Sequence, residues 1–173
     1  MTETYDPRTI ALHWISALLV LALWVAGQCI DLFPRGDPRS TVRSLHILGG
    51  VLLAVLLATR IAWRFGGGAR LPAAAPGRAG QLAVAMHHAL LGLLGLIVVV
   101  GLASVWIRGD TLFDWFTVPS LAPGNKALRH NVVELHGFLA DALLVIAGLH
   151  AAAALWHHHV LKDGVLRRMW PAR

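Results

Sequence analysis

The chain has 173 residues, of which 57% are hydrophobic and 14% are charged, and its mean hydropathy is +0.64. Soluble domains carry about 25% charged residues, so this composition indicates a membrane protein. The net charge of +6 does not indicate a nucleic-acid partner, because the lysines and arginines are scattered over short connecting stretches and form no stripe. The single cysteine, Cys29, excludes an internal disulfide framework and a paired-cysteine metal or redox site.

Four apolar stretches are long enough to cross a membrane as helices. The first lacks a small-residue cleavage site, so we expect a retained helix and not a signal peptide. The loop between residues 108 and 129 has room for a short interfacial helix. We therefore expect one all-α integral membrane domain spanning residues 1–173, a four-helix transmembrane bundle with helices at approximately 11–30, 44–63, 82–107 and 132–158.

The distribution of basic residues predicts the orientation of this bundle. The N-terminus, the second loop and the C-terminal tail hold one, four and four lysines and arginines, nine together. The first and third loops hold three each, six together. Because the cytoplasmic side of a membrane protein carries the excess of basic residues, both termini are expected to be cytoplasmic.

The histidines fall at two depths of the expected bundle. His136 and His150 are fourteen residues apart, which places them within about 40° of one helical face and about 21 Å apart along it. His13 is expected at the cytoplasmic level with His150, and His46 at the outer level with His136. Pairs of imidazoles on facing helices suit the axial ligation of haem iron. Ligation by two histidines leaves no open iron position, so this pattern favours electron transfer.

The same fourteen-residue spacing, together with the turn after His46, indicates further candidate haem-site residues. Gly27 follows His13 by fourteen residues, and Gly50 lies one turn after His46, so either glycine would let a porphyrin approach the backbone. Arg60 follows His46 by fourteen residues, and its forked donors fit a haem propionate. Alternatively, Arg60 is a cytoplasmic anchor whose charged end reaches the interface.

Two more ionisable residues have open roles. His87 begins the third helix at the cytoplasmic level and competes with His13 as the partner of His150. If it is not a ligand, His87 is a hydrogen-bond partner for a propionate or quinone, or simply an interfacial residue. Asp141 lies one to two turns from His136, where it could accept a proton or orient a ligand. We favour the simpler interpretation, a neutral carboxylic acid bonded to a backbone carbonyl.

The segments IALHW, LHILGG, ELHGFLA and GLHAAAAL, which contain His13, His46, His136 and His150, resemble the bacterial cytochrome b561 family. The start of the third helix and the tail extend the likeness over nearly the whole chain. The resemblance implies a bundle holding two haems b, one ligated by His13 and His150 and the other by His46 and His136. It is closest to small stand-alone members that act as superoxide:ubiquinone oxidoreductases. It therefore implies an enzyme of the bacterial inner membrane with no obligatory protein partner.

Superoxide is an anion, so cationic residues near the outer haem would steer it inward. Lys126, Arg129 and Arg43 are the leading candidates, although each could be a solvated loop charge. Ubiquinone would arrive through the lipid, and we expect it near the cytoplasmic haem, close to His87, Arg60 and His13.

Two alternatives remain at this point. The chain could be a cytochrome b subunit that links a partner dehydrogenase or hydrogenase to the quinone pool, although its short loops offer little docking surface. It could also be a non-haem metal or proton transporter that uses its histidines. A transporter would be colourless, and histidines gathered at one depth would suit it better than two separated pairs.

Overall fold

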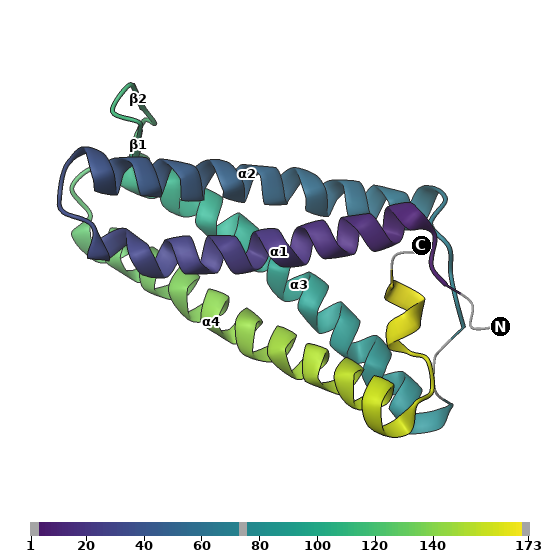
Figure 1. The fold of residues 1–173 in the computed structure, drawn as a ribbon. Helices are drawn as coiled ribbons and strands as arrows, with labels where there is room; N and C mark the ends of the chain where they lie inside the picture. Colours follow the sequence, from purple (N-terminus) through teal and green to yellow (C-terminus); the bar gives the residue numbers. More distant parts are fainter. Residues whose placement is uncertain (1–3, 73–75, 171–173) are drawn as a thin grey trace.

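The computed structural model describes residues 4–72 and 76–170. Four long helices lie side by side and form an elongated bundle (Figure 1). They are α1 (Pro7–Cys29), α2 (Asp37–Gly66), α3 (Gly77–Arg108) and α4 (Lys126–Trp156). Each contains an apolar stretch long enough to cross a membrane, and between 11% and 17% of the residues in those stretches are buried inside the protein. The remaining apolar side chains, such as Leu18 and Val145, face outward, as they would in contact with lipid. The predicted four-helix membrane fold is confirmed.

The helices differ from the predicted bounds of 11–30, 44–63, 82–107 and 132–158, because every helix begins several residues earlier. Capping side chains explain this difference for α1 and α4. The carboxylate of Asp6 accepts a hydrogen bond from the Thr9 backbone N–H at 2.9 Å, and Pro7 occupies the first turn. The side chain of Asn125 likewise accepts from the Leu128 N–H at 2.9 Å. The uncharged runs mark the stretch inside the hydrocarbon, whereas side-chain caps fix the starts of α1 and α4.

The core occupies the middle of the bundle and separates its two ends. Six residues from three helices form it, namely Leu53, Leu57, Leu94, Ile97, Leu139 and Leu143. From α1, Leu19, Val20 and Leu23 pack against this cluster. All of these residues lie between the two predicted histidine levels, so a dry apolar layer divides one level from the other.

The loop between α3 and α4 contains a small antiparallel hairpin, β1 (Thr111–Leu112) and β2 (Phe116–Thr117), which projects from one end of the bundle (Figure 1). The prediction of a short interfacial helix between residues 108 and 129 is therefore wrong. The turn is fastened to α2, because the Phe113 N–H donates to Ser44 Oγ at 2.8 Å and Ser40 Oγ donates to Asp114 at 3.0 Å.

The first and last described segments meet at the opposite end of the bundle (Figure 1). After α4, a π-helical turn (η2, His157–Leu161) and a short 3-10 helix (η3, Leu166–Met169) fold back toward α1. The Tyr5 N–H donates to the Arg168 carbonyl at 3.0 Å, and the Trp14 indole donates to the Met169 carbonyl at 2.8 Å. We call this the terminal end, and the end carrying the hairpin the hairpin end.

Candidate functional site

Two histidines lie together toward the hairpin end. His46 of α2 and His136 of α4 have ring centroids 6.1 Å apart with planes at 89°, and both side chains are half-buried. The sequence placed them at one level, and the structure brings them together. Because both rings project from long helices beside the apolar core, their positions are set by the scaffold and not by a loop.

Each of these rings packs against a glycine of a neighbouring helix. A Cβ added to Gly27 of α1 would lie 3.3 Å from Cε1 of His46, and one added to Gly101 of α3 would lie 2.8 Å from Cε1 of His136. Gly27 was predicted as a site residue, but Gly101 was missed. The signal for Gly101 was present in the sequence, because it follows His87 by the same fourteen residues that separate Gly27 from His13.

The backbone also orients the two rings. His46 Nδ1 lies 3.1 Å from the Leu23 carbonyl, one turn before Gly27. If Nδ1 carries the proton and donates there, the Nε2 lone pair is free for a metal. His136 Nδ1 is buried with no hydrogen-bond partner of ordinary geometry, although the Ile97 carbonyl, one turn before Gly101, is within interaction range of the ring.

These features fit an axial pair for haem. Two imidazoles lie together, one has its Nδ1 beside a backbone carbonyl, and the other has a buried nitrogen without a hydrogen-bond partner in the described residues. A histidine ligand normally donates its second ring N–H to a carbonyl, and the Leu23 carbonyl is in position to accept from His46 Nδ1. The glycines let each ring sit close to the backbone of a neighbouring helix.

Three histidines and one arginine gather at the second level, toward the terminal end. His87 and His150 have ring centroids 5.3 Å apart with planes at 72°. His13 makes its ring contact with Trp14, at 5.4 Å between centroids. Arg60, His87 and His150 all lie within electrostatic range of His13. The predicted residues are therefore brought together, and the close ring contact of His150 is with His87.

The remaining predicted glycine has a different environment. No atom lies within 4 Å of the position that a Cβ would take at Gly50, so Gly50 faces open space and contacts no other helix. Its neighbour Gly49 packs tightly instead, with its added Cβ only 2.6 Å from Leu23 Cδ2. Gly49 thus allows α1 and α2 to approach each other, whereas the role of Gly50 stays a prediction.

A polar pocket of about 360 Å³ opens at the hairpin end. Its walls come from the start of α2 and from the hairpin, and include Arg35, Arg39, Ser40, Arg43, Asp110 and Asp114. Asp110, which is 9% exposed, lies 3.1 Å from an Arg108 nitrogen and 3.9 Å from an Arg43 nitrogen. Burial raises the pKa of Asp110 above its ordinary value, and the two arginines oppose that shift.

The three predicted steering cations therefore differ in their surroundings. Arg43 shares Asp110 with Arg108, and it lies one turn before His46 on α2. Arg129 donates to Ser120 Oγ at 3.2 Å, while its Nε is buried without a partner. Lys126 is exposed at the first turn of α4 and has no ion pair within residues 4–72 and 76–170.

Asp141 is bound differently from the expected neutral acid on a backbone carbonyl. Its Oδ1 accepts hydrogen bonds from the Trp24 indole at 2.8 Å and from the Gln28 side-chain amide at 3.2 Å. Both donors belong to α1. The favoured interpretation was therefore wrong, because two side-chain donors from another helix satisfy the carboxyl oxygen and connect α1 to α4.

Comparisons with known proteins agree with this arrangement. A family model described as prokaryotic cytochrome b561 matches residues 4–172. A "Probable superoxide oxidase CybB" of Yersinia pestis is 30% identical over 176 residues, covering 100% of this chain and 99% of the relative. "Cytochrome b561 homolog 2" of Escherichia coli is 29% identical, covering 96% and 91%. "Cytochrome b562" of Cereibacter sphaeroides is 29% identical, covering 98% and 96%.

Proposed function

The chain belongs to the prokaryotic cytochrome b561 family, and on that basis we propose that it oxidises superoxide at its outer face and reduces ubiquinone. The family makes it a multi-pass bacterial membrane oxidoreductase that binds haem b. The observation that carries the finer proposal is the division of the functional histidines into two groups by an apolar core. Two redox centres at two depths suit electron transfer across a membrane. The "Probable superoxide oxidase" name of a relative that aligns along the whole chain supports the choice of substrate.

We assign the outer haem to His46 and His136. Bound haem supplies a one-electron redox centre, and the chain supplies its ligands and surroundings. Leu23 orients the His46 ring, and Gly27 and Gly101 keep both rings close to the neighbouring helices. His46 and His136 would together hold the haem iron, which would then supply one-electron transfer and not oxygen binding.

We assign the inner haem to His13 and His150, with His87 beside it. His13 is half-buried whereas His87 is exposed, and a ligand is expected on the more enclosed side. Arg60 lies within electrostatic range of His13 and His87, and its guanidinium fits a propionate carboxylate. His87 and Arg60 then remain as hydrogen-bond donors for ubiquinone, which reaches this level through the lipid.

Superoxide would enter at the hairpin end. Arg43, Arg129 and Lys126 place positive charges at this end, and Arg129 has a buried donor that an anion could use. One-electron transfer needs no nucleophile or general base from the protein at this face. The proposal places both termini in the cytoplasm and the protein in the inner membrane, where superoxide arrives from the outer side.

The test is to purify the protein alone in detergent, count haem by pyridine haemochrome, and follow haem reduction by superoxide with and without ubiquinone. We expect two haems b, rapid reduction by superoxide, and reoxidation by quinone. Two haems that superoxide does not reduce would instead indicate a subunit that needs a partner dehydrogenase or hydrogenase. A colourless protein would contradict the haem assignment and favour a histidine-based transporter.

A further inference from the structure

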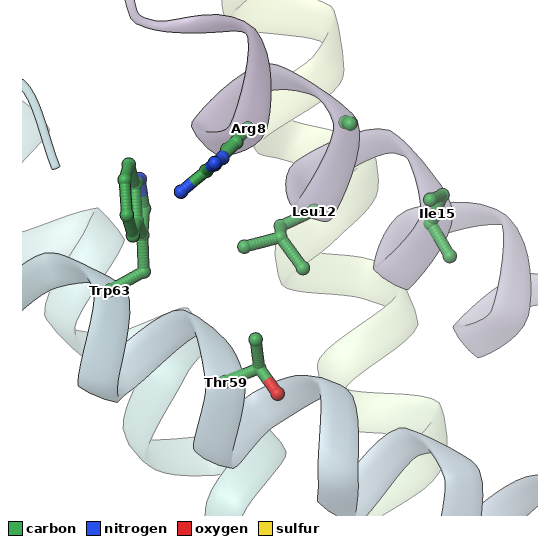
Figure 2. Close-up of a pocket in the computed structure, with 6 residues that line it drawn as sticks. Arg8, Leu12, Ile15, Thr59 and Trp63 are labelled. Carbon is green, nitrogen blue, oxygen red and sulfur yellow. The ribbon is translucent and has the colours of Figure 1, made fainter.

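A groove of about 360 Å³ runs between the start of α1 and the end of α2, and none of the histidines of either level lines it (Figure 2). Six residues line it, namely Arg8, Ala11, Leu12, Ile15, Thr59 and Trp63. Figure 2 shows Arg8 and Trp63 at one end and Ile15 at the other. The Thr59 hydroxyl already donates to the Val55 carbonyl at 2.8 Å, so Thr59 presents its methyl group. The groove is thus apolar along its length and cationic at one end.

The cationic end is held in place by a network of contacts. The Arg8 guanidinium carbon lies 4.8 Å from the centroid of the Trp63 ring, within the range of a cation–π contact. Trp63 is itself fixed, because its indole N–H lies 3.1 Å from Asp6 Oδ1 and 3.2 Å from Thr9 Oγ1. Stacking on an aromatic face leaves the N–H groups at the edge of a guanidinium available.

The positive charge of Arg8 is not neutralised within the described part of the chain. Residues 4–72 and 76–170 contain no carboxylate within ion-pair distance of Arg8. The nearest acid in sequence, Asp6, accepts from the Thr9 side chain and backbone, from Trp63 and from the Ala69 N–H at 3.1 Å. Arg8 therefore offers unused donors at the entrance of an apolar groove.

The groove faces the surroundings of the bundle at the level of a membrane surface. Ile15 is 50% exposed and Trp63 lies near the end of a membrane-spanning helix, where indole rings prefer the interface. Arg8 and Ile15 are seven residues apart, so the groove extends about 10 Å from the interface into the apolar layer. Anionic lipids of the cytoplasmic leaflet attract basic residues at this depth.

We propose that this groove binds an anionic phospholipid, with its phosphate on Arg8 and one acyl chain along Ala11, Leu12 and Ile15. The charge of Arg8 selects the phosphate of a lipid without a compensating cation, and the apolar walls replace neighbouring lipid chains. The proposal concerns a lipid site separate from the haem and substrate residues, so it stands or falls independently of superoxide oxidation.

The experiment uses the full-length protein in mild detergent with phosphatidylglycerol or phosphatidylcholine of identical acyl chains, and counts bound lipids by native mass spectrometry. Wild type should retain phosphatidylglycerol in preference to phosphatidylcholine by on the order of fivefold, the factor expected from one basic residue near an anionic lipid. Arg8→Gln should abolish this preference. Arg70→Gln removes an exposed arginine of the loop after α2 and should leave it unchanged.

Ala11→Leu narrows the groove while keeping Arg8, and should reduce retention of both lipids. The size-exclusion profile and helical circular dichroism of each variant establish that it is folded. An equal loss of the phosphatidylglycerol preference in Arg8→Gln and Arg70→Gln would show a general charge effect and overturn the proposed site. A wild type without preference, or full retention by Ala11→Leu, would overturn it as well.

Discussion

A ring and a glycine meet at two places near the hairpin end, and a Cβ at either glycine would lie closer to the ring than ordinary carbon packing allows. Carbon atoms pack best at about 3.5 to 4.0 Å. The added Cβ positions at Gly27 and Gly101 lie 3.3 Å and 2.8 Å from the nearest ring carbons of His46 and His136. Any larger residue at Gly101 must therefore displace the His136 ring or shift the backbone of α3. The identity of this glycine controls the position of a proposed ligand on another helix.

Gly101→Val should abolish binding of the outer haem and leave the inner haem bound. We expect haem content per protein to fall by about half, because a branched side chain at this position would occupy space that the His136 ring fills. Pyridine haemochrome on the purified variant measures this. Gly92→Val is the matched control on α3, since no atom lies within 4 Å of its Cβ position. Equal haem loss in both variants would argue against a specific contact with His136.

A second residue, Asp110, reduces the positive charge that the hairpin end presents to the outer side. It pairs with Arg108 and Arg43, so part of the positive field at the hairpin end is neutralised within the protein. Asp110→Asn should raise the rate of haem reduction by superoxide at low ionic strength by about two- to fivefold, and the gain should vanish at high salt. Rapid-mixing kinetics over a salt series measures both effects.

Asp37→Asn makes the same change in net charge at the start of α2, without touching an ion pair within the described residues. We expect it to alter the rate much less than Asp110→Asn. If the two variants behave alike, total charge matters and the pairing of Arg43 with Asp110 does not.

At the scale of elements, the two helical hairpins repeat one pattern. In each, the first helix carries a histidine near the terminal end and a glycine fourteen residues later, against which the outer histidine of the second helix packs. Fourteen residues after that outer histidine, the second helix carries another predicted site residue. The four pairs are His13 and Gly27, His46 and Arg60, His87 and Gly101, and His136 and His150. Three of the four positions carry the same residue type in both hairpins, and the fourth is Arg60 in one and His150 in the other.

The helical spacing made much of this site predictable. A fourteen-residue step returns to nearly the same face of any helix, so the depths of His13, His46, His136 and His150 followed from the sequence alone. Rotation about each helix axis does not follow in this way. The sequence therefore left open whether His13 or His87 meets His150, and only the packing of α3 against α4 puts His87 in contact.

The hairpin between α3 and α4 was not predictable for a different reason. Its turn places Phe113 and Asp114 at φ values of 49° and 57°, a conformation that residues other than glycine seldom adopt. Bonds to Ser44 and Ser40 of α2 hold this turn, and those partners are about seventy residues away. Local sequence signals contain no information on such contacts.

Asp141 connects the two helical hairpins through Trp24 and Gln28. Asp141→Leu should lower the free energy of unfolding by about 1 kcal/mol, since hydrogen bonds between membrane helices contribute about 0.6 kcal/mol each on average. Asp141→Asn keeps an acceptor oxygen and should lose less. Reversible unfolding in mixed micelles measures the difference. Equal stability of the Leu variant and wild type would contradict a connecting role.

At the scale of the whole molecule, the terminal end is closed around Asp6. Its carboxylate joins α1, the end of α2 and the following loop through Thr9, Trp63 and Ala69. Burial alone would raise the pKa of Asp6, but the hydrogen bonds from Thr9, Ala69 and Trp63 outweigh it and hold the pKa below its ordinary value. A carboxyl with a lowered folded-state pKa stabilises the fold above its unfolded pKa and loses that contribution as the pH falls.

Asp6→Ala should therefore destabilise the protein by about 1 kcal/mol at pH 7, the usual loss for an N-cap. The gap between wild type and variant should narrow below the unfolded pKa of about 3.9, because wild type then loses its own contribution. Thermal unfolding at pH 7 and at pH 3 measures both. Asp37→Ala, at the start of α2, is the control, and it should change stability by less than about 0.5 kcal/mol. A gap that stays constant with pH would contradict the role of the charged carboxylate.

The single cysteine gives a direct test of the orientation on which the whole proposal depends. Cys29 ends α1 toward the hairpin end, opposite the meeting of the N- and C-terminal segments. If both termini are cytoplasmic, a membrane-impermeant maleimide should label Cys29 on intact spheroplasts. In a Cys29→Ser background, Arg70→Cys, in the loop after α2, should be labelled only after permeabilisation. The reverse pattern would place the arginines near His46 in the cytoplasm. Superoxide would then have to be taken from the cytoplasmic side, and the narrow excess of nine basic residues over six would have given the wrong topology.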